Sequence, residues 1–553
     1  MFFEILIRQP EEFCVDRRIV GEEIEYSKVL RVKDSEGKYV YREADDEFMR
    51  QIFKQIVEPE HPLQHVQDGF FMGNGGQIRL EPSGQHVEIN TPECLTLRDI
   101  VAQDKATELT ALRLTAAIKT KFNTDVVFHK KNSDFQSIFS IEDRIVLTAG
   151  NTRGCHENYC VESELISEIQ TAYQKTINPS SFPGYEQLSL RHLLLFMETR
   201  QILSGGGGLK RLARKNGQSE IIYCVSPRAL HTHLNFGRST TVDETRGIIN
   251  AGRANEALAD PHRFGRLHID SGDANMAEVS TFLKFGTTSA VLEMIENKCW
   301  DETLLGEDPD YNASLFRAIS RDLTCRSIPI RLTNGDIYGA IDIQKLFAKR
   351  WKEYVKTLGF PEEKARLSEL WLEALRCLET DDPKAGRLLD WKIKLQFFKK
   401  YCKKKSLPIE HERIATLDLE YHNPDLQNGI YNRLKNRGLV ERLIYDRDIE
   451  NAILIPPQNT RARLRRHLFD IFTALDVKFS VRWDFIGFKS ERFSEFEFQS
   501  TTPIDLLDPF VYSVESLDIT KKEKIIVELL ETVKRKHDET RVGGSDHGGA
   551  EAG

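Results

Sequence analysis

The segment Arg18-Ile-Val-Gly-Glu-Glu-Ile-Glu-Tyr26 predicts a β-strand that carries two carboxylates on one face. Successive side chains of a strand point to opposite faces, so Glu23 and Glu25 share a face, two residues apart. Like charges placed in this way repel each other unless a cation lies between them. The segment therefore indicates a sheet with a metal-binding face. A solvated face of an edge strand is the alternative.

A second acidic set follows in residues 75–94, Gly-Gly-Gln-Ile-Arg-Leu-Glu-Pro-Ser-Gly-Gln-His-Val-Glu-Ile-Asn-Thr-Pro-Glu-Cys. Residues 69–93 predict a pair of strands, with turns at Gly73–Gly76 and Pro82–Gly84. Arg79 and Glu81 then share one strand face, and Glu88 lies on the neighbouring strand. This places Glu81 as a general base beside a cation and Glu88 as a metal ligand. Each could also be an ordinary surface charge.

The third segment, Gly154-Cys-His-Glu-Asn-Tyr159, sets an imidazole, a carboxylate and an amide side by side. Oxygen ligands suit Mg²⁺, and an imidazole can occupy one further position. His156 and its neighbours therefore indicate a site for a divalent cation and for the phosphate oxygens of a nucleotide. A buried His–Glu pair with a purely structural role is the alternative.

The composition bounds the class of protein. The chain has 553 residues, 40% of them hydrophobic, which is enough for one large domain and a smaller one. Its net charge of -8 argues against a nucleic-acid binder. No apolar run has the length of a membrane span, and Met1–Ile7 does not resemble a signal peptide. Nine cysteines without a CxxC pair indicate a reducing cytoplasm.

Helices and strands are mixed along the chain, which predicts an α+β fold. Residues 96–122 predict a helix, because a Thr-x-x-Asp start precedes helical apolar spacing. Helices dominate residues 362–474. A strand-like pattern over 477–498 and an amphipathic helix over 518–537 then predict a small C-terminal α+β domain. We expect a catalytic domain at 1–474, the small domain at 475–537 and a disordered tail at 538–553; the alternative is that residues after 474 extend the main core.

Taken together, these segments resemble the Pup ligase and depupylase family, which belongs to the glutamine synthetase-like carboxylate-amine ligases. The three segments occur in the family's order, and further matches extend the resemblance to about Phe510. These matches are Arg266-Leu-His-Ile-Asp-Ser-Gly-Asp-Ala-Asn-Met276, Leu283–Thr287, Leu388–Trp391, Leu417–Tyr421, Gly429–Arg433 and Pro456–Arg463.

The resemblance implies a fold and a reaction. The fold is a glutamine synthetase-like large domain, an antiparallel sheet cradle packed by helices. The reaction uses ATP and Mg²⁺ to phosphorylate the C-terminal glutamate side chain of a small ubiquitin-like (Pup-like) modifier. A lysine of a substrate protein then attacks the acyl phosphate and forms an isopeptide bond.

The resemblance also assigns roles to residues. Glu81 stands where the family has its catalytic aspartate. Glu23 and Glu88 match the metal-binding glutamates, and Glu25 and His156 are expected to join them. The expected nucleotide-binding residues are Gln77, Arg79, Thr91, Arg461, Arg463 and Trp483. For Arg461 and Arg463, packing of the small domain on the large one is an equal alternative.

Three departures from the family pattern stand out. Glu81 adds one methylene to the usual aspartate. Gln77 and Arg79 replace the usual Arg and Tyr, and a guanidinium has no lone pair to offer to Mg²⁺. Residues 252–262 lack the family's Thr-Arg-Asp-Glu-Pro-His run. We therefore expect a divergent member that acts on a related modifier.

Three other functions stay open at this point. The first is a depupylase or deamidase that hydrolyses the same bond. The stretch from Tyr26 to Gly73 is too short for the depupylase loop, and Leu506–Phe510 is ligase-like, whereas Ala274–Thr287 and Gly429–Arg433 look more like the depupylase. The second is a small-molecule carboxylate-amine ligase. The third is an inactive protein that only binds the modifier.

Overall fold

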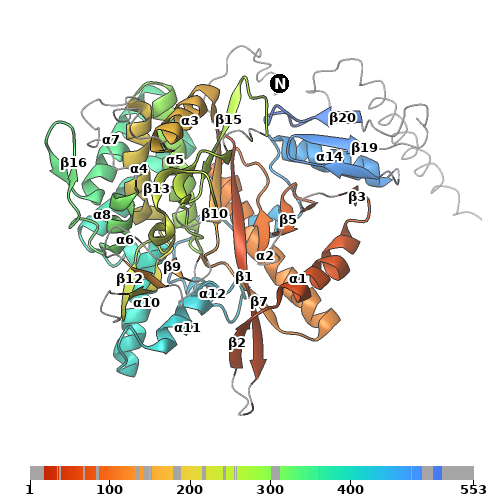
Figure 1. Ribbon diagram of the computed structural model, residues 1–553, viewed down its shortest axis with the longest axis horizontal. Coiled ribbons are helices and arrows are strands. Elements are labelled where there is room, and N and C mark those ends of the chain that lie inside the picture. The colour runs from red at the N-terminus through yellow and green to blue at the C-terminus, as the bar shows by residue number, and fades with distance from the viewer. Residues whose placement is uncertain are drawn as a thin grey trace, which may run out of the picture.

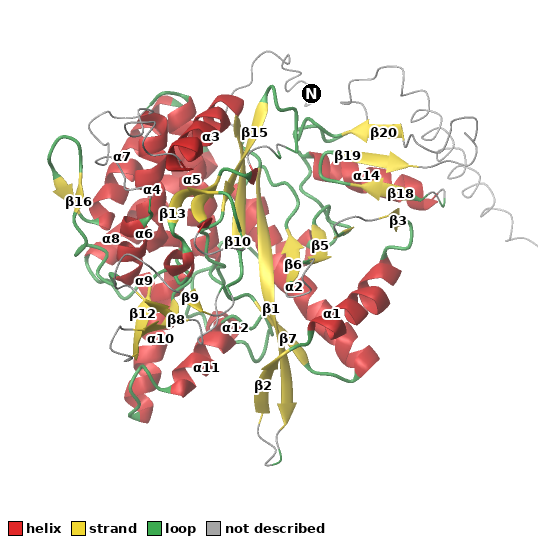
Figure 2. Ribbon diagram, viewed as in Figure 1, coloured by secondary structure: helices red, strands yellow, loops and turns green. Residues whose placement is uncertain are grey.

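The computed structural model describes residues 18–513, with longer gaps at 133–137, 141–147, 178–187, 214–218, 300–311 and 489–501 and with shorter gaps elsewhere. A central sheet separates a large group of helices from a smaller C-terminal unit (Figures 1 and 2). The predicted helix at 518–537 and the predicted tail at 538–553 lie outside the described residues.

The central sheet is built around one long strand, β1 (Val20–Lys33), which corresponds to the first predicted strand. Its strand order is β13-β14-β15-β10-β1-β6-β5-β4, and β2 and β7 also pair with β1. All pairings are antiparallel except that of β13 with β14. The other strands are β2 (Tyr39–Glu43), β4 (Phe70–Phe71), β5 (Gln77–Leu80), β6 (Val87–Asn90), β7 (Val126–His129), β10 (Cys155–Glu162), β13 (Leu234–Gly237), β14 (Gly247–Asn250) and β15 (Phe264–Ile269). The predicted pair at 69–93 is therefore β5 and β6, with β4 as a third strand.

The register of the sheet separates a polar face from an apolar one. Ile24 lies opposite Ile89, which lies opposite Ile78, and all three are buried in one core with helix α2 (Leu97–Phe122). Residues one position away point to the other face, where Glu25 lies opposite Glu88 and Glu88 opposite Arg79. The alternation read from the sequence is thus what separates the core from the polar face.

Helix α2 begins as the sequence predicts. The Thr96 side chain accepts a hydrogen bond from the Asp99 backbone N–H at 3.0 Å, which satisfies one of the open donors of the first turn. Asn123 ends the helix with a positive φ of 49°. The buried side of α2 packs on β1 and β7 and fixes the position of the sheet.

A helical layer covers the rest of the core and lies together on one side in Figure 1. Its main packing contacts join α4 with α5 and α7, and α7 with α8. Besides α2, the described α-helices of the whole chain are α1 (Asp46–Ile52), α3 (Ser163–Ile177), α4 (Leu188–Ser204), α5 (Glu278–Glu296), α6 (Ser314–Arg321), α7 (Ala340–Thr357), α8 (Glu362–Glu379), α9 (Ala385–Leu388), α10 (Asp390–Lys405), α11 (Glu412–Tyr421), α12 (Ile430–Asn436), α13 (Asp446–Ala452) and α14 (Arg461–Ala474). A short π-helix lies at Phe53–Val57, and 3₁₀ helices lie at Glu58–Glu60 and Arg228–His231. Smaller sheets are formed by β8 (Ile138–Ser140), β9 (Thr148–Ala149), β11 (Gly208–Ala213) and β12 (Ser219–Cys224), and by β16 (Ile330–Arg331) and β17 (Ile337–Tyr338).

Two buried ion pairs join the sheet to this helical layer. Glu157 on β10 accepts two hydrogen bonds from Arg200 of α4, at 2.6 and 2.7 Å. Glu22 on β1 pairs with Lys284 of α5. All four side chains are almost fully buried, so each carboxylate needs its cation. The predicted Glu157 of the third segment therefore has a structural partner rather than a place on the polar face.

The C-terminal unit is a sheet of β20 (Thr502–Asp505), β19 (Phe485–Phe488), β18 (Phe479–Val481) and β3 (Gln64–His65), packed on α14. Its core contains residues on both sides of position 475, because Leu464 and Phe472 of α14 lie in it together with Ile486 and Ile504. The domain boundary at 475 stays a prediction.

The buried carboxylate of Glu93 joins this unit to the central sheet. Glu93, just after β6, accepts a bond from Arg461 at 2.6 Å and two bonds from Arg465, at 2.7 and 3.1 Å. Burial raises the pKa of Glu93, but the two guanidinium groups outweigh it and lower the pKa to about 2.

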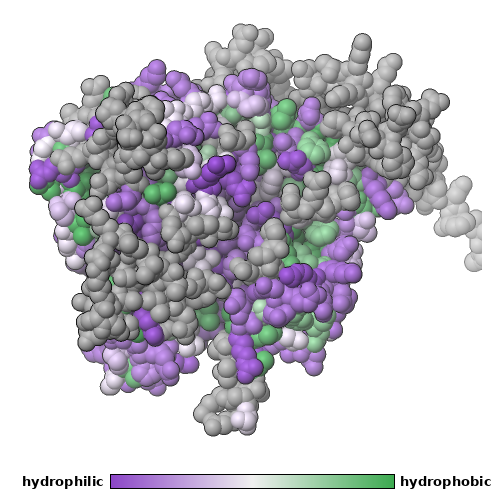
Figure 3. Space-filling model, viewed as in Figure 1, coloured by the Kyte–Doolittle hydropathy of each residue, from purple (hydrophilic) through white to green (hydrophobic). Residues whose placement is uncertain are grey.

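None of the described helices is both long and apolar enough to span a membrane. Among the residues coloured in Figure 3, hydrophilic ones predominate on the face shown.

Replacement of Glu93 tests whether it stabilises the contact between the C-terminal unit and the central sheet. Glu93→Gln leaves two buried guanidinium groups without their counter-ion, so the free energy of unfolding at pH 7 should fall by about 3–5 kcal/mol, measured by urea denaturation. The carboxylate stabilises the protein above its ordinary pKa of 4.5, and this is lost as the pH falls toward 2, so the difference between the proteins should shrink over that range. Glu379→Gln, at an exposed ion pair with Lys345, is the control and should barely move the midpoint. Equal midpoints for Glu93→Gln and wild type would contradict the role of Glu93.

Candidate active site

A cavity of about 650 Å³ lies between the polar face of the central sheet and strands β18 and β19. Seven residues predicted from the sequence line it, namely Glu23, Gln77, Arg79, Glu88, Thr91, Arg461 and Trp483. Glu25, Glu81 and His156 do not line this cavity, but they are grouped with residues that do. Arg463 lies outside both sets. The structure therefore brings most of the predicted site into one place, over β1, β5, β6 and β10.

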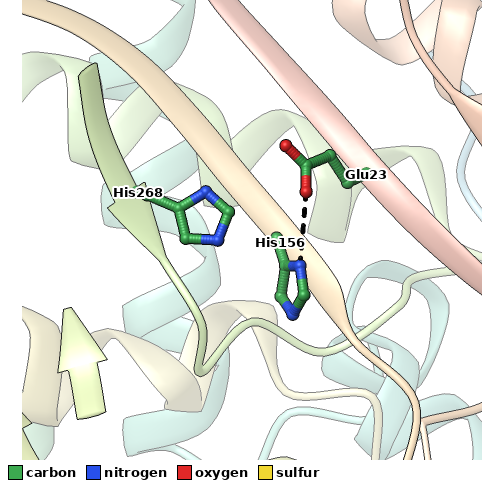
Figure 4. A group of neighbouring side chains, drawn as sticks. All are labelled: Glu23, His156 and His268. Carbon is green, nitrogen blue, oxygen red and sulfur yellow. Dashed lines mark hydrogen bonds and ion pairs between the residues drawn. The ribbon is translucent and has the colours of Figure 1, made fainter. Parts of the chain in front are cut away.

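The first group of possible metal ligands is Glu23, His156 and His268, from three neighbouring strands (Figure 4). Glu23 Oε2 lies 3.4 Å from His156 Nδ1, and Glu23 Oε1 accepts a bond from Arg266 at 2.6 Å. His268 Nδ1 lies 2.9 Å from Asn158 Oδ1, and its Nε2 lies 2.9 Å from the buried carboxylate oxygen Asp270 Oδ1. His156 Nε2 is buried and has no hydrogen-bond partner among the described residues.

Local packing explains the Gly-Cys-His order at this group. A Cβ on Gly154 would lie 2.2 Å from His156 Nε2, so only glycine fits beside the imidazole. The Gly154 backbone N–H also donates to Glu25 Oε2 at 2.6 Å. Cys155 points to the opposite face, where its thiol lies 2.8 Å from Glu22 Oε1. One short segment thus positions both a possible metal ligand and the second carboxylate of β1.

The second group is Glu25, Glu81 and Glu88, whose oxygens lie within 4.8 Å of one another. Arg79 is part of the same neighbourhood, since its Nη2 donates to Glu88 Oε2 at 2.7 Å. Burial and the charges of Glu25 and Glu88 raise the pKa of Glu81 to about 7. A carboxyl group with this pKa is half ionised near neutral pH, which suits a general base.

The other carboxylates differ in their ionisation. Burial raises the pKa of Glu23, but Arg266 and His156 outweigh it and lower the pKa well below the ordinary range. The pKa of Glu25 is lowered because His156 and the Gly154 N–H outweigh burial. Burial and Glu23 raise the pKa of Glu88 despite Arg79. The face therefore combines carboxylates whose pKa is lowered with carboxylates whose pKa is raised, as expected where acid–base chemistry and cation binding share a site.

On the C-terminal side, Trp483 forms an aromatic wall of the cavity. Its ring packs edge-on against Phe71, and the Arg465 guanidinium lies 5.1 Å from the indole centroid. Thr91 accepts a bond from the Glu22 N–H at 2.9 Å and holds the loop after β6. Gln77 lies opposite Asn90 at the base of the cavity.

The two predicted phosphate-binding arginines have other contacts. Arg461 donates to Glu93 and to the carbonyls of Leu258 and Leu506, and Arg463 is exposed and donates weakly to the Gln458 carbonyl at 3.4 Å. These contacts favour the packing alternative for Arg461, and the nucleotide-binding role of both residues stays a prediction.

Comparison with known proteins identifies the family. The family model described as "Pup-ligase protein" matches residues 16–486. The chain belongs to the Pup ligase family. A Pup–protein ligase of Kineococcus radiotolerans is 32% identical over 85% of this chain and 93% of its own length. A Pup–protein ligase of Acidimicrobium ferrooxidans is 30% identical over 91% of this chain and 98% of its own length.

Solved structures of the Pup ligase family agree with this assignment. The ligase PafA in complex with the prokaryotic ubiquitin-like protein Pup matches with a TM-score of 0.73 and 26% identity, over 98% of this chain and 99% of that chain. PafA in complex with ADP matches with a TM-score of 0.67 and 26% identity, over 91% and 98%. The predicted fold class, an α+β sheet cradle packed by helices, is confirmed. The roles of individual site residues stay predictions.

Sequence reasoning missed His268, Arg266 and Arg465. The quoted match Arg266-Leu-His contains the first two, and strand alternation would have placed them on one face. Strand alternation alone could not predict that β15 pairs with β10, which places His268 opposite Asn158. Arg465 lies four residues after Arg461 on α14, on the same side of the helix, and that spacing was the available signal.

Replacement of Glu23 tests the first group of ligands. Glu23→Gln keeps the shape but removes a charge that a cation would share with His156 and His268. Mn²⁺ binding in the presence of ADP, measured by calorimetry, should weaken at least about tenfold. The control is Glu256→Gln, which lines the same cavity and also contacts Arg266 but is more exposed. If both variants bind Mn²⁺ with wild-type affinity, Glu23 is not a ligand.

Proposed function

We propose that this protein is an ATP-dependent ligase that joins the C-terminal glutamate side chain of Pup, or of a closely related modifier, to lysine side chains of proteins. The observation that carries the proposal is the cavity over the polar sheet face, whose walls hold the candidate cation ligand Glu23 and the Arg79–Glu88 pair, next to Glu81 with a pKa of about 7. Membership in the Pup ligase family supplies the reaction class. Every described cysteine is free, which supports a reducing cytoplasm as the place of action.

The walls of the cavity are suited to hold ATP. Trp483 offers an aromatic face for the base, and Thr91 and Gln77 line the cavity next to the carboxylates. Glu23 would hold Mg²⁺ through a carboxylate oxygen, the donor that this ion prefers, and the imidazoles of His156 and His268 would occupy further positions. When bound, Mg²⁺ neutralises charge on phosphate oxygens during phosphoryl transfer.

The reaction then needs two steps. A carboxylate oxygen of the modifier attacks the γ-phosphorus of ATP and ADP leaves, which gives the acyl phosphate. The lysine nitrogen attacks the acyl carbon, the C–O bond to phosphate breaks, and the amine proton must go to a base. Glu81 would accept that proton, because it lies beside the cavity wall formed by Arg79 and Glu88 and is half ionised near pH 7.

The role of Glu81 can be tested with an isosteric variant. Glu81→Gln cannot accept a proton, so the rate of conjugation should fall by roughly 10²–10⁴-fold, whereas ADP affinity should change little. Glu81→Asp, which restores the family's residue, should retain part of the activity. Normal conjugation by Glu81→Gln would mean that another group is the base.

The stoichiometry separates a ligase from a hydrolase. An unactivated carboxylate is a poor acceptor for an amine in water, so each isopeptide bond should consume one ATP. We expect equal amounts of conjugate and ADP when the purified protein is mixed with ATP, Pup ending in glutamate and a lysine-bearing acceptor. Cleavage of preformed conjugate without matching ADP release would instead identify a hydrolase.

A further inference from the structure

Arg79 lies among the carboxylates of the second group rather than at its edge. Its backbone is directly opposite Glu88, which is directly opposite Glu25, so the three side chains form one row across β5, β6 and β1. Glu81 lies two residues beyond Arg79, and its carboxylate lies within 4.8 Å of those of Glu25 and Glu88. A single cationic side chain thus belongs to a set of three carboxylates.

The surroundings fix the stem of Arg79 in this position. A Cβ on Gly69, whose φ is 151°, would lie 2.6 Å from the Arg79 Cβ, so the chain before β4 packs directly on this residue. Glu88, which accepts the bond from Arg79, is 1% exposed, whereas the Arg79 side chain is 26% exposed. Arg79 also lines the cavity. The guanidinium therefore extends from a buried carboxylate toward the space assigned to the nucleotide.

A guanidinium and a divalent cation compete for such a place. Arginine carries a permanent charge and five N–H donors but no lone pair, so it can bind carboxylate and phosphate oxygens and cannot bind a metal ion. With Arg79 Nη2 at 2.7 Å from Glu88 Oε2, a cation held by Glu88 in this group would lie close to the guanidinium and be repelled by it.

The first group of ligands differs in the chemistry that it offers. Its members include two imidazoles, and His156 Nε2 is buried without a hydrogen-bond partner among the described residues. An imidazole lone pair is satisfied by a metal ion or a proton. The second group contains only carboxylates, which bind either a metal ion or a guanidinium, and here Arg79 already binds Glu88. The second group therefore already has a cation supplied by the protein.

We propose that the Arg79 guanidinium takes the place of one divalent cation in this site. It neutralises the Glu25–Glu81–Glu88 group and turns its remaining donors toward phosphate oxygens, so that this group binds no metal ion. The inference rests on the proposed nucleotide site. It makes part of the positive charge of the site a permanent component of the protein.

Counting bound Mn²⁺ tests this substitution. We would measure Mn²⁺ by electron paramagnetic resonance on the full-length protein with saturating ADP. Arg79→Gln removes the guanidinium, and it should bind one more Mn²⁺ per chain than wild type. Arg482→Gln is the matched control, because Arg482 lines the same cavity but pairs with Asp484 away from the carboxylates, and it should keep the wild-type number. Equal numbers in Arg79→Gln and wild type would overturn the inference.

A measurement on wild type covers the case in which Arg79→Gln does not fold. Crystals grown with Mn²⁺ and ADP should show no anomalous peak among Glu25, Glu81 and Glu88, and a peak there would also overturn the inference. Neither measurement needs modifier or acceptor. If the Mn²⁺ count behaves as expected but conjugation fails, the proposed ligase function is wrong and this inference stands. If conjugation is normal and the counts are equal, only this inference falls.

Discussion

The architecture depends on the concentration of carboxylates on one face of a buried sheet. Oxygens of Glu25, Glu81 and Glu88 lie within 4.8 Å of one another, and two unit charges at that separation repel by roughly 3–4 kcal/mol for an effective dielectric constant of about 20. Such a face is tolerable only if cations accompany it. Arg79 and Arg266 supply part of that charge from the protein itself. The composition of the surrounding strands follows from this requirement.

On their other face, toward the helices, the same strands carry a second set of carboxylates. Glu22 and Glu157 alternate with Glu23 and His156 along β1 and β10, and each is paired with a cation from a helix. A buried ion pair adds little net stability compared with an apolar pair, but it is costly when misaligned. These pairs therefore fix the register of the sheet against the helices, and with it the positions of the carboxylates on the polar face.

Much of the site could be predicted because it depends on local alternation. Period-two spacing places Glu23 with Glu25, and the order of β5 and β6 places Arg79 beside Glu88. The capped start of α2 at Thr96 was equally local. What could not be predicted depends on pairing between distant segments. His268 joins the site only because β15 pairs with β10. The sequence left phosphate binding and packing open for Arg461, because its partner Glu93 lies 368 residues earlier in the chain. The C-terminal boundary shares this difficulty, since α14 packs with strands that come after it.

Strand β3 lies near the start of the chain and pairs in parallel with β18, whose indole neighbour Trp483 closes the cavity. These partners are separated by roughly 400 residues, so a ribosome that adds about 5–20 residues per second needs roughly 20–80 s between them. During that interval the edge of β3 lacks β18, its partner in the C-terminal sheet. Because Trp483 is one of its walls, the cavity of a nascent chain can be completed only after residue 483 has been synthesised.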